Sequence, residues 1–303
     1  MPGPVQVGLA VSGGPDSLAL LLLAHQAPGG FEVATVDHGL RPESADEAQA
    51  VASLCESLGV HHTTLRPTIA PTGNLQSNAR AARYAALGEW AKARRLDAIV
   101  TAHHADDQAE TLLMRLSRGA GVRGLAGMRR LATVPGHPDL PLLRPLLGWR
   151  KRELEAIVAE AGLDPARDPS NTDRRFERVN VRNGLAAAPW LDAAALAASA
   201  AHLAEADTAL DWAAAREWDE RVTRAAKALT YLPLAPRAVQ LRVLERIVAL
   251  LGNEGTPRGS EIARLHAALS AGGVATLGGV RAAGRSDGWR FTPAPPRRQR
   301  KGG

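Results

Sequence analysis

Apolar runs and amphipathic stretches alternate along the first half of the chain. The apolar run Val5–Val11 predicts a strand, and the pattern from Asp16 to His25 predicts a helix directly after it. The same alternation predicts strands at Phe31–Asp37, His61–Leu65, Asp97–Ala102 and Leu140–Leu147, and helices at Glu43–Leu58, Leu75–Leu96 and Ala105–Arg118. Strands that alternate with helices form parallel sheets covered by helices. We therefore expect an α/β domain with a Rossmann-like parallel sheet and helices on both faces.

The pattern changes after Trp149, where helical periodicity dominates. The predicted helices are Lys151–Gly162, an Ala-rich segment at 191–224, Pro236–Leu251 and Ser260–Ala271, and two short strands follow at Val274–Leu277 and Trp289–Thr292. We expect a first domain at residues 1–190 and a smaller, mainly helical C-terminal domain at 191–292. The prolines and basic residues of 293–303 predict a disordered tail.

Composition narrows the class of protein. The chain has 303 residues, of which 45% are hydrophobic, enough for a main domain and a smaller one. No segment is apolar enough to cross a membrane and no signal-peptide pattern is present, so we expect a cytoplasmic protein without a membrane partner. The net charge of +6 lies mostly in the tail and permits a polyanionic partner without requiring one. The single cysteine, Cys55, excludes an internal disulfide or a CxxC site, and we expect it to be buried and inert.

A turn of small residues joins the first predicted strand to its helix: Ser12, Gly13, Gly14, Pro15, Asp16 and Ser17. Its glycines let the backbone turn and let a ligand approach closely. The helix behind it presents unpaired N–H groups and the positive end of its dipole. Such a combination binds phosphate, although the same turn also occurs for purely structural reasons. No Lys follows the second Gly as in a Walker A loop, which indicates different nucleotide chemistry.

Two further polar clusters follow strand ends. The segment HHADDQAET (103–111) opens a helix on which residues 103, 107 and 110 share a face. Its acidic residues favour the helix dipole, and they also suit a divalent cation or a substrate ammonium group. The third cluster, Asp37–Arg41, is also compatible with a simple turn. Because ligands bind at the carboxyl ends of parallel strands, we expect all three clusters in one crevice.

The segment SGGPDS (12–17) resembles the SGGxDS loop of the PP-loop ATP pyrophosphatases, with every fixed position present. Further segments resemble one branch of that superfamily, the tRNA(Ile)-lysidine synthetases. They are VDHGLRPES (36–44), ARAARY (79–84), HHADDQAETLLMRLSRGAGVRGLAGM (103–128), LLRPLL (142–147) and DPSNTDRRFERVNVR (168–182). The resemblance is loose beyond residue 190. Val179 stands where the family usually has Asn, and Asn180 comes one place later, which leaves the role of that Asn open here.

The resemblance implies a reaction in two steps. ATP adenylates the C2 oxygen of the wobble cytidine of an isoleucine tRNA with a CAU anticodon, and pyrophosphate leaves. The ε-amine of L-lysine then displaces AMP and forms lysidine. The attacking amine must be neutral, which requires a nearby base or a shielded pocket. ATP and Mg²⁺ are the implied cofactors, and a homodimer is left open.

The resemblance also suggests roles for individual residues. We expect Asp37, Asp107 and Glu110 to be catalytic, with Asp107 and Glu110 as Mg²⁺ ligands. We expect ATP to contact the six residues of the loop together with His38 and His103. The expected lysine or tRNA contacts are Arg41, Arg83, Arg115, Arg178 and Arg182.

Three alternatives stay open. A sulfur-inserting PP-loop enzyme acting on tRNA normally requires paired or catalytic cysteines, and Cys55 is poorly placed for that role. Amide ligation requires an ammonia source, and nothing like a glutaminase domain is visible. A non-catalytic RNA-binding protein would need neither the loop nor the carboxylates. The basic residues after residue 190 fit tRNA contact or a solvated helix face equally well: Arg216, Arg221, Arg224, Lys227, Arg237, Arg242 and Arg246.

Overall fold

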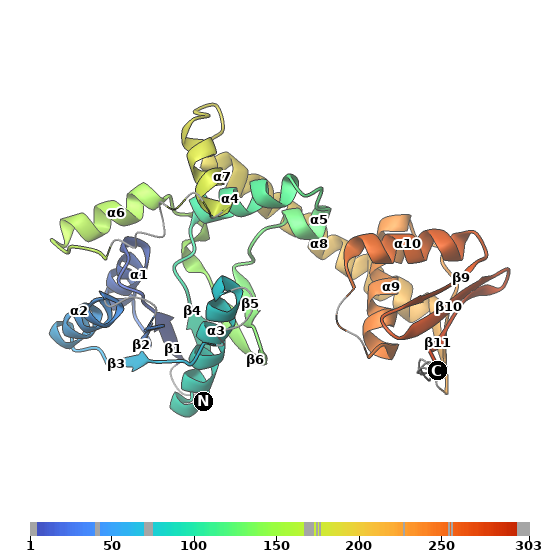
Figure 1. Cartoon of the computed structure of the whole chain (residues 1–303), viewed down its shortest axis with the longest axis horizontal. Helices are drawn as coiled ribbons and strands as arrows, with labels where there is room; N and C mark the ends of the chain where they lie inside the picture. Colours follow the sequence, from blue (N-terminus) through green and yellow to red (C-terminus); the bar gives the residue numbers. More distant parts are fainter. Residues whose placement is uncertain are drawn as a thin grey trace, which may run out of the picture. The chain divides into compact units, whose positions relative to one another are not determined.

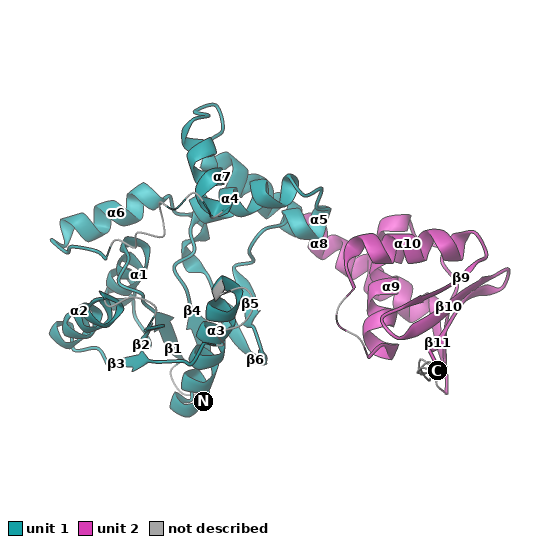
Figure 2. Cartoon of the chain, in the orientation of Figure 1, with its two compact units in different colours: residues 1–204 teal, residues 205–303 magenta. Residues whose placement is uncertain are grey.

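The computed structural model describes residues 5–39, 43–69, 75–166, 173, 175, 177–226, 228–253, 255 and 257–295. The chain forms two compact units, residues 1–204 and 205–303 (Figure 2). The division lies inside helix α8 (Ala193–Arg221), further along the chain than the boundary expected at residue 190.

The first unit contains a six-stranded sheet in the order β3-β2-β1-β4-β6-β5 (Figure 1). The strands are β1 (Gln6–Ala10), β2 (Gly30–Val36), β3 (His62–Leu65), β4 (Ala98–Val100), β5 (Leu131–Val134) and β6 (His137–Leu143). All neighbouring strands pair in parallel except β5, which pairs antiparallel with β6. The α/β class and the parallel sheet are therefore confirmed. The strand order reverses beside β1, because the chain passes from β1 to β2 and β3 on one side and returns to β4 on the other.

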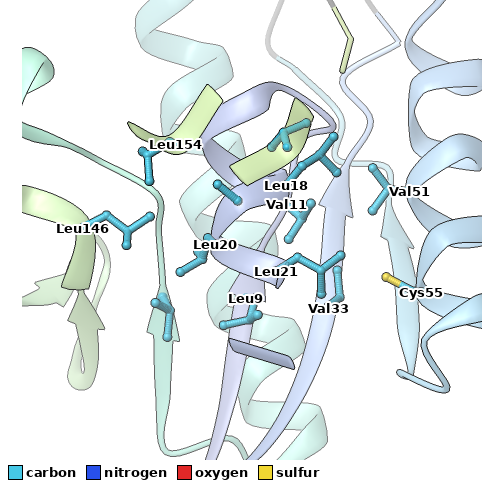
Figure 3. Close-up of a cluster of buried hydrophobic side chains, with 13 residues drawn as sticks. Leu9, Val11, Leu18, Leu20, Leu21, Val33, Val51, Cys55, Leu146 and Leu154 are labelled. Carbon is cyan, nitrogen blue, oxygen red and sulfur yellow. The ribbon is translucent and has the colours of Figure 1, made fainter. Parts of the chain in front are cut away.

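Helices cover both faces of this sheet. Successive residues of a strand point to opposite faces, so each face has its own buried cluster. Leu9 and Val33 belong to a buried cluster that includes side chains from α1, α2 and α6 (Figure 3). Ala10 and Ile99 belong to a second cluster, formed with α3 on the other face. The helices of the first unit are α1 (Pro15–Gln26), α2 (Glu43–Ser57), α3 (Leu75–Arg94), α4 (Ala105–Leu116), α5 (Val122–Leu125), α6 (Lys151–Glu160) and α7 (Glu177–Ala186).

Cys55 lies on α2 at the edge of the first cluster, next to Val51 (Figure 3). It is fully buried, and burial raises the pKa of its thiol to about 11. The prediction that this cysteine is buried is confirmed, and its lack of reactivity stays a prediction.

The predicted strand Leu140–Leu147 is wrong at its end. β6 stops at Leu143, and the 3₁₀ turn η1 (Pro145–Gly148) follows. Pro145 has no N–H to donate to a sheet and its φ suits the first residue of a helical turn, which explains the early stop. The hairpin partner β5 was not predicted.

The second unit is not mainly helical, and that prediction is wrong. It contains a five-stranded antiparallel sheet in the order β7-β8-β11-β10-β9. The strands are β7 (Val222–Ala225), β8 (Ala228–Tyr231), β9 (Val274–Leu277), β10 (Val280–Arg285) and β11 (Gly288–Pro293). Two helices, α9 (Arg237–Leu251) and α10 (Gly259–Ser270), contribute to the same core, with residues from the end of α8.

The core of the second unit depends on this sheet. Tyr231 of β8 and Trp289 of β11 are buried and meet edge to face, with ring centroids 5.6 Å apart. Glu217 of α8 is also buried and accepts hydrogen bonds from Tyr231 Oη (3.0 Å) and from the N–H groups of Leu234 (2.9 Å) and Ala235 (3.0 Å). This carboxylate therefore ties the end of α8 to the loop that follows β8.

Most of the predicted disordered tail, residues 296–303, lies outside the described residues, and its first residue, Pro293, ends β11. Among the described residues, none of the helices is both long and apolar enough to span a membrane.

Candidate functional site

A cavity of about 480 Å³ opens at the carboxyl ends of β1, β2 and β4, beside the point where the strand order reverses. The three polar clusters meet here: the lining includes Ser12, Gly14, Pro15 and Asp16 from the first, His38 from the second, and His104 and Asp107 from the third. Arg83, Arg178 and Arg182 also line it, as do Ser44, Glu47 and Lys151. Helix N-termini and charged side chains thus surround one space.

The loop after β1 is held in shape by its own polar groups. Ser17 Oγ accepts a hydrogen bond from Ser12 N–H (3.1 Å) and donates one to the carbonyl of Gly14 (3.0 Å). Gly13 has φ +87°, which a residue with a side chain rarely adopts. Gly14 caps α1 without a side-chain hydrogen bond, so the first N–H groups of α1 are left for a ligand.

His104 gathers the carboxylates of two clusters. It is almost completely buried, and its Nε2 lies 3.5 Å from Oδ2 of Asp16 and 3.5 Å from Oδ2 of Asp107. Burial alone would lower its pKa, but Asp106, Asp16 and Asp107 outweigh burial and raise the pKa of His104 to about 10. Oδ1 of Asp16 is buried and has no hydrogen-bond partner among the described residues. This carboxylate oxygen is suited to a cation or a hydrogen-bond donor from a ligand.

Asp37 holds the turn after β2 and does not line the cavity. Its Oδ1 accepts hydrogen bonds from Ser44 Oγ (2.7 Å) and Gly39 N–H (2.9 Å), and Arg66 Nε lies 3.3 Å from Oδ2. The Ser44 and Gly39 hydrogen bonds lower the pKa of Asp37. Its neighbour His38 does line the cavity, and burial followed by the charge of Arg83 lowers the pKa of His38. The turn thus presents His38 to the cavity.

Glu110 is not part of the cavity lining and lies between two arginines of α7. It is 2% exposed, with Oε1 2.6 Å from Arg182 Nε and Oε2 2.9 Å from Arg178 Nε. Nη2 of Arg178 also lies 3.9 Å from Asp107 Oδ1. Both guanidinium groups line the cavity, whereas Glu110 reaches it only through them.

Of the other predicted residues that the structure describes, Arg83 lines the cavity, whereas His103 and Arg115 do not. Burial lowers the pKa of His103 to about 4, and its Nδ1 is paired with Thr101 Oγ1 at 2.9 Å. Arg83 lines the cavity, and burial lowers its pKa. Arg115 points elsewhere and donates to the carbonyls of Gly124 (2.6 Å) and Gly127 (3.2 Å). Arg41 lies outside the described residues.

Sequence reasoning missed several residues of the cavity. His104 belongs to the segment at 103–111 but was assigned no role there, and the doubled His was the available signal. Lys151 and Glu47 follow no motif that marks them, since they reach the cavity through the packing of α6 and α2. Val179, at the position of the family Asn, is 6% exposed in α7, whereas Asn180 is exposed.

Comparison with known proteins gives concordant matches. Residues 2–188 match the PP-loop domain family. The tRNA(Ile)-lysidine synthase of Novosphingobium aromaticivorans is 56% identical over 296 residues, which cover 97% of this chain and 90% of that protein. The tRNA(Ile)-lysidine synthase of Zymomonas mobilis is 41% identical, with 97% and 90% covered. Among solved structures, the U34-tRNA thiolase NcsA from Methanococcus maripaludis gives a TM-score of 0.56 at 19% identity, over 66% of this chain and 72% of that one, a likeness of fold alone.

Proposed function

The chain belongs to the tRNA(Ile)-lysidine synthases and carries their PP-loop domain, and from this membership we propose that it joins L-lysine to the wobble cytidine of a CAU-anticodon isoleucine tRNA. In the first step, the C2 oxygen of cytidine attacks the α-phosphorus of ATP and pyrophosphate leaves. In the second step, the lysine ε-amine attacks C2, loses a proton and displaces AMP. The adenylate is needed because an oxygen on C2 is otherwise a poor leaving group.

The loop at the N-terminus of α1 is the observation that carries this proposal. The positive φ of Gly13 turns the backbone so that the uncapped N–H groups of α1 face the cavity lined by Ser12 and Gly14. A pyrophosphate group fits these donors. Lys151, at the start of α6, adds a positive charge on the same cavity wall.

The carboxylates divide into two roles. Asp16 and Asp107 line the cavity, and we propose that they position the lysine ammonium group or the Mg²⁺ that accompanies the triphosphate. Glu110 orients Arg178 and Arg182, whose guanidinium groups would contact AMP, the lysine carboxylate or tRNA. Asp37 shapes the turn that presents His38.

Magnesium would be held mainly by the nucleotide. In the described ranges, no group of three or more His, Cys, Asp or Glu side chains is arranged to hold a metal ion. Two carboxylates that converge on His104 fit a cation whose other ligands are phosphate oxygens and water. When bound, Mg²⁺ would offset the negative charge of the triphosphate.

The test is a nucleoside analysis by mass spectrometry. Unmodified CAU-anticodon isoleucine tRNA is incubated with the protein, ATP, Mg²⁺ and lysine, and we expect lysidine only when both ATP and lysine are present. Asp16→Asn should abolish most pyrophosphate release, whereas Asp139→Asn, which changes an exposed carboxylate in the β5–β6 hairpin, should not. The proposal would be overturned if the parent protein left the wobble cytidine unmodified, or if Asp16→Asn and Asp139→Asn released pyrophosphate equally.

The alternatives make different predictions in the same assay. A sulfur-inserting enzyme would add sulfur to the nucleoside and lose activity in Cys55→Ser, whereas lysidine formation should tolerate that change. A non-catalytic RNA-binding protein would bind tRNA without releasing pyrophosphate. We further propose that residues 191–292 contact the tRNA. We also propose that a homodimer, where one forms, catalyses the same reaction, and sedimentation measured alongside the assay would test this.

A further inference from the structure

A path of bonded groups leads from Lys151, which lines the cavity, to the start of α8. Asp106, the second residue of α4, accepts hydrogen bonds from the backbone N–H of Lys151 (2.8 Å) and from Nη2 (3.3 Å) and Nε (3.4 Å) of Arg150. His104 Nδ1 lies 3.7 Å from Asp106 Oδ2. Burial raises the pKa of Asp106, but His104, Lys151 N–H and Arg150 together hold it well below its ordinary range. Asp106 therefore holds the start of α6, through Lys151 N–H and the guanidinium group of Arg150.

Arg150 also contacts the residue that precedes helix α8. Its remaining terminal nitrogen, Nη1, donates to Asp192 Oδ1 at 2.8 Å. Asp192 in turn accepts hydrogen bonds from the N–H groups of Ala194 (3.2 Å) and Ala195 (3.3 Å), so it caps α8. One guanidinium group thus joins the first turn of α4 to the residue that caps α8.

The complete path runs from the Lys151 backbone through Asp106 and Arg150 to Asp192. It begins at a residue that lines the cavity and ends at the cap of a helix that runs on to Arg221, within the second unit. All four residues belong to the first unit.

We propose that Arg150 is a positioning residue that couples the cavity to the N-terminus of α8, so that ATP and tRNA each change the affinity of the protein for the other. This inference rests on the proposed function, which supplies the two ligands. Arg150 touches neither ligand in this scheme and acts through Asp106 and Asp192.

The coupling follows from shared partners. Lys151 lines the cavity, and its backbone N–H donates to Asp106, the carboxylate that also holds Arg150. A triphosphate that draws Lys151 toward the cavity therefore moves the preceding residue, Arg150, and changes its bond to Asp192. The first turn of α8 shifts with Asp192 when nucleotide binds. Since coupling of two binding equilibria is reciprocal, tRNA that alters the start of α8 must alter nucleotide affinity equally.

The experiment measures tRNA affinity of the full chain with and without a non-hydrolysable ATP analogue. For the parent protein we expect the analogue to change the dissociation constant by about fivefold or more. In Arg150→Gln we expect the change to fall below about twofold, because the path is broken. Asp192→Asn is the second test variant, since Asn caps a helix as well as Asp does and only the charge is lost. It should lose the coupling while α8 stays capped.

Arg94→Gln is the matched control. It removes a two-point ion pair with Glu32 (2.7 Å for each bond) elsewhere in the same unit, and should keep the coupling of the parent. Equal coupling in the parent, Arg150→Gln and Asp192→Asn would overturn the inference, as would a parent that binds both ligands independently. A parent that binds neither ATP nor tRNA, or forms no lysidine, would instead overturn the proposed function.

Discussion

Gly13 shows how one residue sets the geometry of the loop after β1. We expect Gly13→Ala to lower pyrophosphate release by about tenfold or more, because a side chain at φ +87° costs about 1–3 kcal/mol and the loop must relax away from its binding shape. A Cβ there would also lie 3.4 Å from Val51 Cγ2 and 3.6 Å from Ala166 Cβ. Steady-state release of pyrophosphate from ATP in the presence of tRNA measures the effect.

Gly162→Ala is the control for backbone strain. Gly162 follows α6 with φ +67°, and a Cβ there would meet nothing within 4 Å. This variant should lose about 1–2 kcal/mol of folding stability and keep its activity. If both glycine variants release pyrophosphate at the parent rate, the geometry of the loop is not limiting.

His104 gives the first unit a pH-dependent contribution to stability. Its pKa is raised in the folded state, from an ordinary value of 6.5 to about 10. The unfolded chain therefore loses this proton at lower pH than the folded chain does, so the stabilisation is fully present below pH 6.5 and is lost as the pH rises through about 10. We expect the difference in Tm between the parent and His104→Asn to shrink steadily over this range.

Thermal melts of both proteins across the pH range test this, with His25→Asn, at the exposed end of α1, as the control. If the difference in Tm between the parent and His104→Asn is constant, or grows with pH, the carboxylates do not hold the imidazole of His104 protonated.

At the scale of elements, α7 depends on α4 for its position. We expect Glu110→Gln to speed amide hydrogen exchange in α7 by about tenfold, because the hydrogen bond from Arg182 and the ion pair with Arg178 together contribute about 1–2 kcal/mol. Glu32→Gln, which breaks the pair with Arg94, should leave exchange in α7 unchanged. Unaltered exchange in both variants would mean that α7 is held by its apolar contacts alone.

The elements that the sequence predicted well are those with a strong local pattern. Strands β1 to β4 and their helices alternate plainly, and β9 lies at the residues expected. Strands β7, β8 and β10 were missed, because Ala, Lys and Arg in VTRAAKALTY and VRAAGR carry no strong strand propensity. They form strands through pairing, with Leu229 and Tyr231 buried against β11 and the helices.

The residues of the site also divide into those that a local sequence pattern predicts and those that only tertiary packing brings together. The loop at 12–17 and the helix start at 103–111 could be placed because each directly follows a predicted strand. The pairing of Glu110 with Arg178 and Arg182, and that of Asp106 with Arg150, join residues far apart in the sequence. Such contacts depend on how α4, α6 and α7 pack, and no local pattern indicates them.

At the scale of the whole molecule, the basic residues of the second unit differ in how accessible they are to a bound tRNA. Arg242 is half-buried and forms ion pairs with Asp207 and Asp211, and Arg246 stacks on Trp218 with its Cζ 4.1 Å from the ring centroid. Arg224 and Arg237 are exposed. We expect the double variant Arg224→Gln, Arg237→Gln to bind tRNA more weakly and to reduce the slope of log affinity against log salt by about 0.7 for each phosphate that is no longer neutralised.

Filter-binding titrations at several salt concentrations measure that slope, with Arg94→Gln as the control for loss of one positive charge in the first unit. A double variant with the affinity and slope of the parent would mean that these two residues do not contact the tRNA backbone.

The two edge strands of the sheet in the second unit, β7 and β9, differ in charge. β7 contains Arg224, whereas β9 has the uncharged sequence VATL and exposes 58% of Val274. Unpaired backbone groups beside uncharged, β-prone residues invite strand addition from another chain, and a lysine there discourages it. Thr276→Lys should therefore raise the concentration at which the heated protein begins to scatter light, with the melting temperature unchanged. Scattering that begins at the same concentration in both proteins would place the aggregation-prone segment elsewhere. We therefore expect strand β9, remote in sequence from the loop after β1, to set the concentration at which this enzyme precipitates.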